Sequence, residues 1–85
     1  QEVSVNDQQV TLSRRLWRLL EYLAMHRGQT VSKDTLIDRV WGMDSDVLEN
    51  AVEAAVRKLR QKLDDDKGDT IQTVHGFGYR LKNNE

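Results

Sequence analysis

Apolar residues recur at helical spacing in three segments of the chain, and this repeat limits the fold more than any other feature. The spacing puts the apolar residues on one face of each segment, so it predicts three amphipathic helices around a shared core. Ser13 and Ser32 are suited to cap the first two helices, and Gly28 and Gly42 to end them. We expect the third helix at about residues 47–63.

Each predicted helix contributes its own set of buried residues. From the first helix we expect Leu16, Leu19, Leu20 and Leu23. From the second we expect Leu36, Ile37, Val40 and Trp41. From the third we expect Leu48, Val52, Val56, Leu59 and Leu63. Asp46 and Glu49 have the spacing of a capping box, which predicts that the third helix begins beside them.

Short segments with alternating apolar residues predict a β-hairpin at each end of the helical region. "EVSV" and "QVTL" flank an Asn-Asp turn at residues 6–7, and "TIQTVH" and "YRLK" flank a Gly-Phe-Gly turn. Gly76 and Gly78 should supply the positive φ angles of that tight turn. Tyr79 should pack beneath the hairpin, with Phe77 as either a surface contact or a lid on the core. The order of elements is that of an α+β, winged helix-turn-helix domain.

The composition argues against several classes of function. The chain has 85 residues, enough for one domain, and it contains no cysteine for disulfides or thiolate metal sites. No apolar stretch has the length of a membrane-spanning helix. His26 and His75 lie far apart, and no nucleophile stands beside a base in a known motif. The sequence therefore predicts no enzyme, no metal and no cofactor, and "DDDKGD" is expected to be a solvated loop.

Charge is strongly polarised along the predicted third helix, although the net charge of the chain is only −1. Its first part is acidic, while Arg57, Lys58, Arg60 and Lys62 follow without an intervening acid. The predicted outward face also carries small residues, which a helix needs if it is to enter a major groove about 12 Å wide. A solvated helix face is the other interpretation of such a run. The outward residues are Ala51, Ala54, Ala55, Arg57, Lys58, Gln61 and Lys62.

Three segments together resemble the DNA-binding effector domain of OmpR/PhoB-type response regulators. They are "VTLSRRLWRLLEYLAMHRGQTVSKDTLIDRVWG", "ENAVEAAVRKLRQKL" and "IQTVHGFGYRL", and they cover the chain from about Val10 to Leu81. The resemblance implies a cytoplasmic bacterial transcription factor domain that makes no membrane contact and follows a receiver domain outside this chain. It implies double-stranded DNA with direct-repeat half-sites as the ligand, a dimer on DNA, and RNA polymerase and a sensor kinase as partners.

The resemblance also implies roles for individual residues, with the recognition helix at about 47–63 in the major groove and the wing at about 70–82 in the adjacent minor groove. Arg57 and Arg60 would hold phosphates, Lys58 would reach a base edge, and Ala54 would touch a thymine methyl group. The further DNA-binding candidates are Asn50, Lys62, Thr73 at a phosphate and His75 at the minor groove. The loop implied to contact RNA polymerase consists of Met43, Asp44, Ser45, Asp46 and Val47.

The chain departs from the family pattern at several DNA-facing positions. His75 stands where Arg is usual, Ala55 where His is common, and Asn50 where Arg or Ser often occurs. With fewer donors on the reading surface, the isolated domain should bind weakly and depend on pairing. Two alternatives stay open: a winged helix of the ToxR/CadC type, which has no receiver, and a winged helix that binds a protein through its acidic loop.

Overall fold

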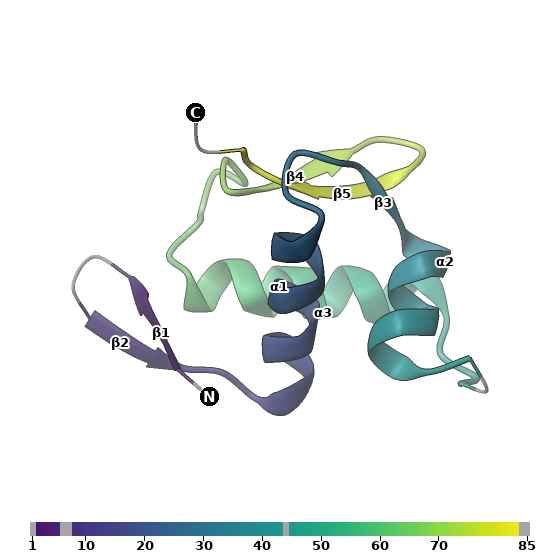
Figure 1. Cartoon of the computed structure of the whole chain (residues 1–85), viewed down its shortest axis with the longest axis horizontal. Helices are drawn as coiled ribbons and strands as arrows, with labels where there is room; N and C mark the ends of the chain where they lie inside the picture. The colour runs from purple at the N-terminus through teal and green to yellow at the C-terminus, as the bar shows by residue number, and fades with distance from the viewer. Residues whose placement is uncertain (1, 6–7, 44, 84–85) are drawn as a thin grey trace.

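The computed structural model describes residues 2–5, 8–43 and 45–83 (Figure 1). In chain order the elements are β1 (Glu2–Val5), β2 (Gln8–Thr11), α1 (Arg14–Met25), β3 (Val31–Ser32), α2 (Lys33–Leu36), the π-helical turn η1 (Ile37–Trp41), α3 (Glu49–Lys62), β4 (Ile71–Val74) and β5 (Gly78–Leu81). The α+β class and the winged helix-turn-helix order are confirmed. The predicted Asn-Asp turn lies outside the described residues.

The strands form two separate sheets. β1 and β2 make a two-stranded antiparallel sheet, and β3, β5 and β4 make a three-stranded sheet in that order. β3, for which the sequence analysis predicts no strand, pairs antiparallel with β5, with Val31 opposite Tyr79. Figure 1 shows the β4–β5 hairpin, which we call the wing, above α3, and the β1–β2 hairpin at the left-hand end of the molecule.

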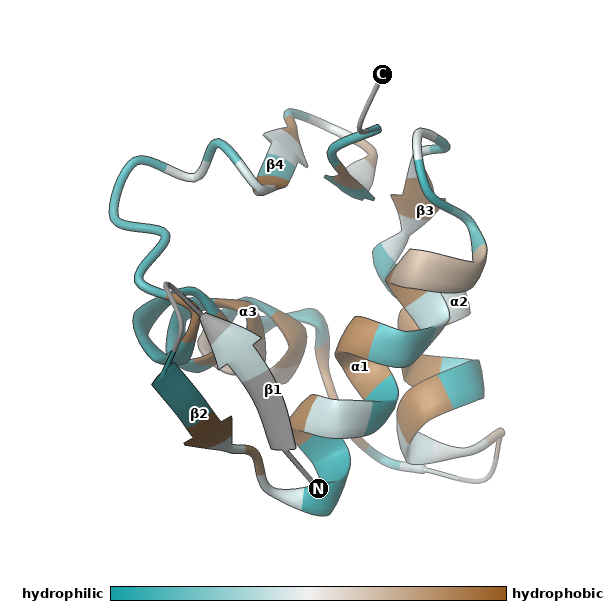
Figure 2. Cartoon of the chain, turned by 60° about the vertical axis from the view of Figure 1, so that its left-hand side comes forward, coloured by the Kyte–Doolittle hydropathy of each residue, from teal (hydrophilic) through white to brown (hydrophobic). Residues whose placement is uncertain are grey.

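The core lies where the three helices meet the three-stranded sheet. Leu19 and Leu23 of α1, Leu36 of α2 and Leu59 of α3 are fully buried, and Figure 2 shows the apolar residues of α1 and α3 between these helices. Side-chain caps set two of the helix starts: Ser13 Oγ accepts a hydrogen bond from the Leu16 amide (3.2 Å), and Ser32 Oγ accepts one from the Thr35 amide (3.1 Å). Both serine caps were predicted from the sequence.

The start of α3 differs from the prediction. The helix begins at Glu49 with Leu48 as its N-cap, and no side-chain hydrogen bond caps it, so the Asp46–Glu49 capping box was wrong. Leu48 is 71% exposed because it lies before the first turn, whereas Ala55 is buried and not on the outward face. Burial on α3 therefore begins at Val52.

Gly76 and Gly78 have different roles, and only one matches the prediction. Gly76 has a φ of +83° and makes the turn of the wing. Gly78 does not have a positive φ; it lies in β5, where an added Cβ would overlap the Val31 carbonyl oxygen. The backbone of β3 thus lies against Gly78, and only glycine leaves room for this close approach. Tyr79 is buried as predicted, while Phe77 is 71% exposed and is no lid on the core.

Candidate nucleic-acid interface

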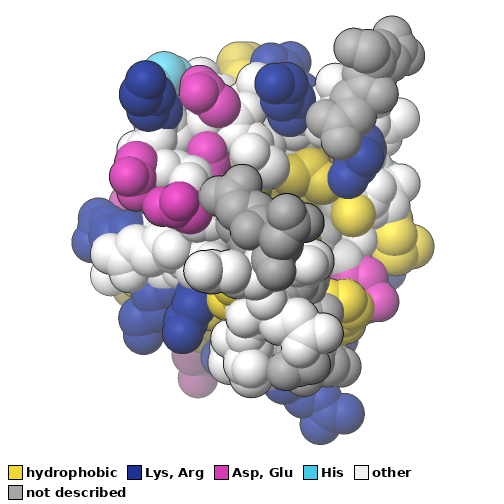
Figure 3. All heavy atoms as spheres, turned by 90° about the vertical axis from the view of Figure 1, so that its left-hand side faces the viewer, with side chains coloured by type: hydrophobic (Ala, Val, Ile, Leu, Met, Phe, Trp, Pro, Cys, Tyr) yellow, Lys and Arg dark blue, Asp and Glu magenta, His cyan; other side chains and the backbone are white. Residues whose placement is uncertain are grey.

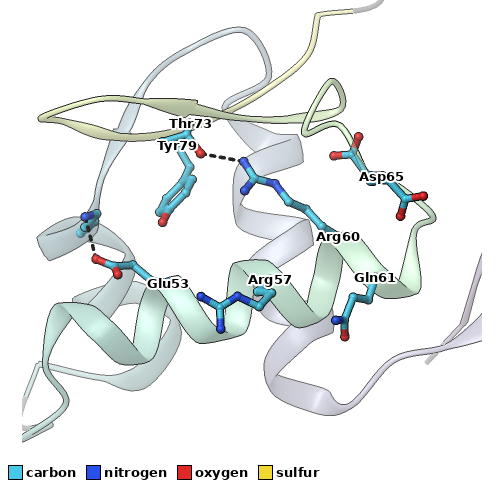
Figure 4. Close-up of a pocket in the computed structure, with 9 residues that line it drawn as sticks. Glu53, Arg57, Arg60, Gln61, Asp65, Thr73 and Tyr79 are labelled. Carbon is cyan, nitrogen blue, oxygen red and sulfur yellow. Dashed lines mark hydrogen bonds and ion pairs between the residues drawn. The ribbon is translucent and has the colours of Figure 1, made fainter.

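One face of α3 is open to solvent along most of its length. Asn50, Ala54, Arg57 and Gln61 are all exposed and recur at a spacing that places them on one side of the helix. We call these four residues the reading face. Figure 4 shows Arg57 and Gln61 on the same side of α3. Sequence reasoning placed Gln61 on the outward surface but gave it no role.

A groove of about 490 Å³ separates α3 from the wing, and we call it the wing-side groove. Its lining residues are Lys33, Glu53, Arg57, Arg60, Gln61, Asp65, Asp66, Thr73 and Tyr79. Lys33 Nζ donates a hydrogen bond to Glu53 Oε2 at 3.0 Å across the groove, and this bond raises the pKa of Lys33 above its ordinary value. Lys33 thus offsets the charge of Glu53, one of the two exposed acids of α3.

Arg60 points from α3 into the wing and not into solvent (Figure 4). Its Nε donates to the Ile71 carbonyl at 3.0 Å, and its Nη2 donates to the same carbonyl and to Thr73 Oγ1 at 2.8 Å. The guanidinium carbon also lies 5.9 Å from the centre of the Tyr79 ring. Two of the three guanidinium nitrogens are therefore used inside the domain, which fixes the distance between α3 and β4.

Asp65 binds the backbone amide of Ile71, while Arg60 binds the carbonyl of the same residue. Although Asp65 sits in the loop expected to be solvated, it is only 7% exposed. Its carboxylate accepts hydrogen bonds from the amides of Asp69 (2.9 Å), Thr70 (3.1 Å) and Ile71 (2.9 Å). Arg60 thus binds the carbonyl of Ile71, and Asp65 binds its amide. In the sequence nothing distinguishes Asp65 from the aspartates on either side, so this role could not be predicted.

A second groove, of about 290 Å³, runs along the opposite side of the reading face, between α3 and the start of α1. We call it the α1-side groove. It is lined by Ser13, Arg15, Leu16, Trp41, Ala51, Ala54, Ala55 and Lys58. The guanidinium carbon of Arg15 lies 5.1 Å from the centre of the Trp41 ring. The structure therefore brings Ala54 and Lys58, both predicted site residues, next to Arg15, which the sequence had not suggested.

The remaining predicted site residues lie at the edges of this surface. Thr73 is on the exposed edge of β4, His75 is exposed in the turn of the wing, and Lys62 is exposed at the end of α3. In the loop before α3, Met43 is 84% exposed, and Ser45 Oγ accepts a hydrogen bond from the Val47 amide. Asp44 lies outside the described residues.

Acidic and basic side chains occupy separate areas on one side of the molecular surface. Figure 3 shows acidic side chains gathered on one part of the left-hand side of the molecule, with Lys and Arg side chains around them.

Within the described part of the chain, no group of three or more His, Cys, Asp or Glu could hold a metal ion. Of the helices that the structure describes, none is long and apolar enough to cross a membrane.

Comparison with known proteins points to regulators of transcription. The family model described as "Transcriptional regulatory protein, C terminal" matches residues 7–81. The chain is 38% identical over 82 residues to sensory transduction protein RegX3 of Mycolicibacterium smegmatis and 35% identical over 82 residues to transcriptional regulatory protein CusR of Escherichia coli K12. These matches cover 94% and 95% of this chain but only 36% of either relative.

Two solved structures match almost the whole fold. The DNA-binding domain of E. coli CadC superposes with a TM-score of 0.84 at 38% identity, covering 98% of this chain and 79% of that one. The DNA-binding domain of Klebsiella pneumoniae RstA, solved in complex with the RstA box, superposes with a TM-score of 0.84 at 31% identity, covering 95% and 82%. The family match, the response-regulator relatives and the winged helix agree: the chain belongs to the C-terminal DNA-binding domains of OmpR/PhoB-type response regulators.

Proposed function

We propose that this domain binds double-stranded DNA sequence-specifically, with α3 in the major groove and the wing at the adjacent minor groove. The observation that carries the proposal is the reading face, which is exposed, small at Ala54 and flanked by a groove on each side. Arg60 joins α3 to the wing, so the two DNA-contacting elements have a fixed separation. The RstA domain, which has the same fold, was solved bound to its DNA site.

Within this arrangement the residues divide by position. We assign Arg57 to a backbone phosphate, Lys58 and Asn50 to base edges or nearby phosphates, and Ala54 to a thymine methyl group. Lys62 extends the contact along the backbone. Gln61 adds an amide that can pair with adenine.

On the wing, Thr73 and His75 are the DNA-facing residues. Thr73 accepts its hydrogen bond from Arg60, so its hydroxyl hydrogen remains available to donate to a phosphate. His75 lies at the turn that would reach the minor groove. For Arg60 we propose that positioning of Thr73 and the wing is its main contribution, with any phosphate contact secondary.

The chain spans about 36% of the length of the curated relatives it matches. We propose that it is the C-terminal part of a longer cytoplasmic, non-enzymatic regulator, with a receiver domain that a sensor kinase phosphorylates. On DNA the protein would bind direct-repeat half-sites as a dimer. The loop with Met43, Ser45, Asp46 and Val47 exposes apolar surface before α3, which supports a contact with RNA polymerase.

Fluorescence anisotropy with a labelled random-sequence duplex tests the proposal. About four phosphate contacts should give a log–log slope of affinity against salt of roughly −3 to −4. Arg57→Ala should make the slope shallower by about one unit while leaving thermal stability unchanged. Arg60→Ala should lower thermal stability, because it releases the wing.

The result that contradicts the proposal is a shallow salt dependence that Arg57→Ala does not alter. In that case the fold would serve protein binding, and the acidic loop before α3 would be the surface to examine.

A further inference from the structure

The reading face of α3 lies between two grooves, and the function proposed above gives no role to Arg15, which lines the α1-side groove. In Figure 1, α3 runs between the wing above it and the start of α1 below it. A helix that enters a major groove meets a phosphate backbone on each side, because both walls of the groove are made of backbone. A duplex seated on the reading face therefore brings one backbone to each of the two grooves.

The two grooves differ in charge. The wing-side groove is lined by three acids, Glu53, Asp65 and Asp66, and two of its cations are already engaged: Lys33 pairs with Glu53, and Arg60 is bound to the wing. Among the described residues that line the α1-side groove, the charged ones are Arg15 and Lys58, and none is an acid. The α1-side groove is thus the more favourable of the two for a phosphate.

The side chain of Arg15 has a defined place at this groove. Its guanidinium carbon lies 5.1 Å from the centre of the Trp41 ring, and cation–π contact limits its freedom. Trp41 is the last residue of η1, whose π-type hydrogen bond joins the Gly42 amide to the Ile37 carbonyl at 2.9 Å. Arg15 itself is exposed, so its charge faces outward beside Ala54 and Lys58 of α3.

We propose that Arg15, held over Trp41, forms with Lys58 a second phosphate-binding site on the side of α3 away from the wing. The inference rests on the proposed function, since it needs α3 in a major groove. The ligand is the backbone of the DNA strand opposite to the one that the wing approaches. The domain would then hold both walls of the major groove, with Arg15 and Lys58 on the α1 side not offset by an acid among the lining residues.

Salt titrations of DNA affinity with three single variants test this inference. Arg15→Ala should make the log–log salt slope shallower by about one unit, as Arg57→Ala should on the reading face. Arg27→Ala removes the same charge from an exposed position just after the other end of α1 and should leave the slope unchanged. Thermal unfolding of Arg15→Ala should stay close to that of the unchanged domain, because the exposed side chain gives up one cation–π contact.

Single methylphosphonate substitutions then locate the contact. In a duplex selected from random sequence, neutralising the phosphate that Arg15 holds should weaken binding of the unchanged domain but not of Arg15→Ala. If Arg15→Ala keeps the unchanged slope while Arg57→Ala loses about one unit, the second site is wrong and the DNA-binding proposal stands. If neither variant alters the slope, the DNA-binding proposal itself is wrong.

Discussion

The two hairpins of this domain have strands of equal length but very different support. β1 and β2 have four residues each and pair only with one another, and along β2 only Val10 packs against the core. β4 and β5 also have four residues each, but β3 extends their sheet, and Arg60 and Asp65 hold Ile71 from both sides. Since an isolated hairpin is marginal in water, the fixed position of the wing comes from groups outside the wing.

Of the contacts that support the wing, the close approach of β3 to Gly78 should contribute most to stability. Gly78→Ala places a methyl group against the Val31 carbonyl oxygen, so β3 must separate from β5. We expect the free energy of unfolding to fall by at least about 3 kcal/mol. Gly76→Ala, where an added Cβ meets no atom within 4 Å, should lose only about 1–2 kcal/mol from its left-handed backbone. Urea unfolding of the two variants measures both losses. Equal losses would show that the close approach of β3 to Gly78 does not contribute to stability.

The buried carboxylate comes next. Asp65→Asn leaves one oxygen to accept from three amides and turns an NH₂ group toward a backbone donor. We expect a loss of about 2–3 kcal/mol in the free energy of unfolding and weaker DNA binding through a displaced wing. Asp66→Asn, at the exposed neighbour, is the matched control and should stay within about 0.5 kcal/mol. Urea unfolding measures both variants; a similar loss in each would remove the special role of Asp65.

A matched pair of glutamines compares the hairpins directly. In the wing, Gln72 lies opposite Arg80 and accepts a hydrogen bond from its Nε at 2.9 Å. In the N-terminal hairpin, Gln9 is exposed opposite Ser4. Gln72→Thr should lower the free energy of unfolding by about 0.5–1 kcal/mol, whereas Gln9→Thr should change it by less than about 0.5 kcal/mol. Thermal unfolding of both variants provides the comparison. A larger loss of stability for Gln9→Thr than for Gln72→Thr would contradict the prediction.

The smallest expected effect is on alkaline stability. Burial raises the pKa of Tyr79 above its ordinary value of 10.0. Above pH 10 the unfolded chain loses this proton while the folded domain keeps it, so stability falls as pH rises through the folded pKa. Tyr79→Phe should reduce that fall, measured by urea unfolding between pH 9 and pH 11.

The free energy of unfolding of Tyr79→Phe should still fall to some extent at alkaline pH. The pKa of Lys33 is also raised, by its hydrogen bond to Glu53, and its contribution is likewise lost as pH rises through the folded value. A pH profile of Tyr79→Phe identical to that of the unchanged domain would contradict the prediction.

Local chemistry predicted much of the fold. The apolar repeats and the serine caps located α1 and α2, because caps and periodicity act over a few residues. The start of α3 was missed because its N-cap is Leu48, which makes no side-chain cap bond, while Asp46 and Glu49 resembled a better one. β3 and Gly78 were missed for a shared reason: their pairing is set by a strand more than forty residues away in the chain.

The candidate site could be predicted in part. The cations of α3 were identified from the sequence because charge along a helix is visible there. The internal bonds of Arg60 and the buried carboxylate of Asp65 depend on β4 folding back over α3, which no local pattern encodes. The cluster of Arg15, Trp41 and Lys58 similarly joins three helical segments.

The hydrogen bonds of Asp65 have a consequence for chain length. They connect Asp65 directly to Asp69, Thr70 and Ile71. Residues 66–68 therefore form a short loop whose two ends, Asp65 and Asp69, are held together. Because the Asp65 side chain holds both ends of this loop, extra residues there would enlarge the loop without moving the wing. This stretch is accordingly the place where a label or an epitope could be inserted with the wing left in position, although Asp66 itself lines the wing-side groove.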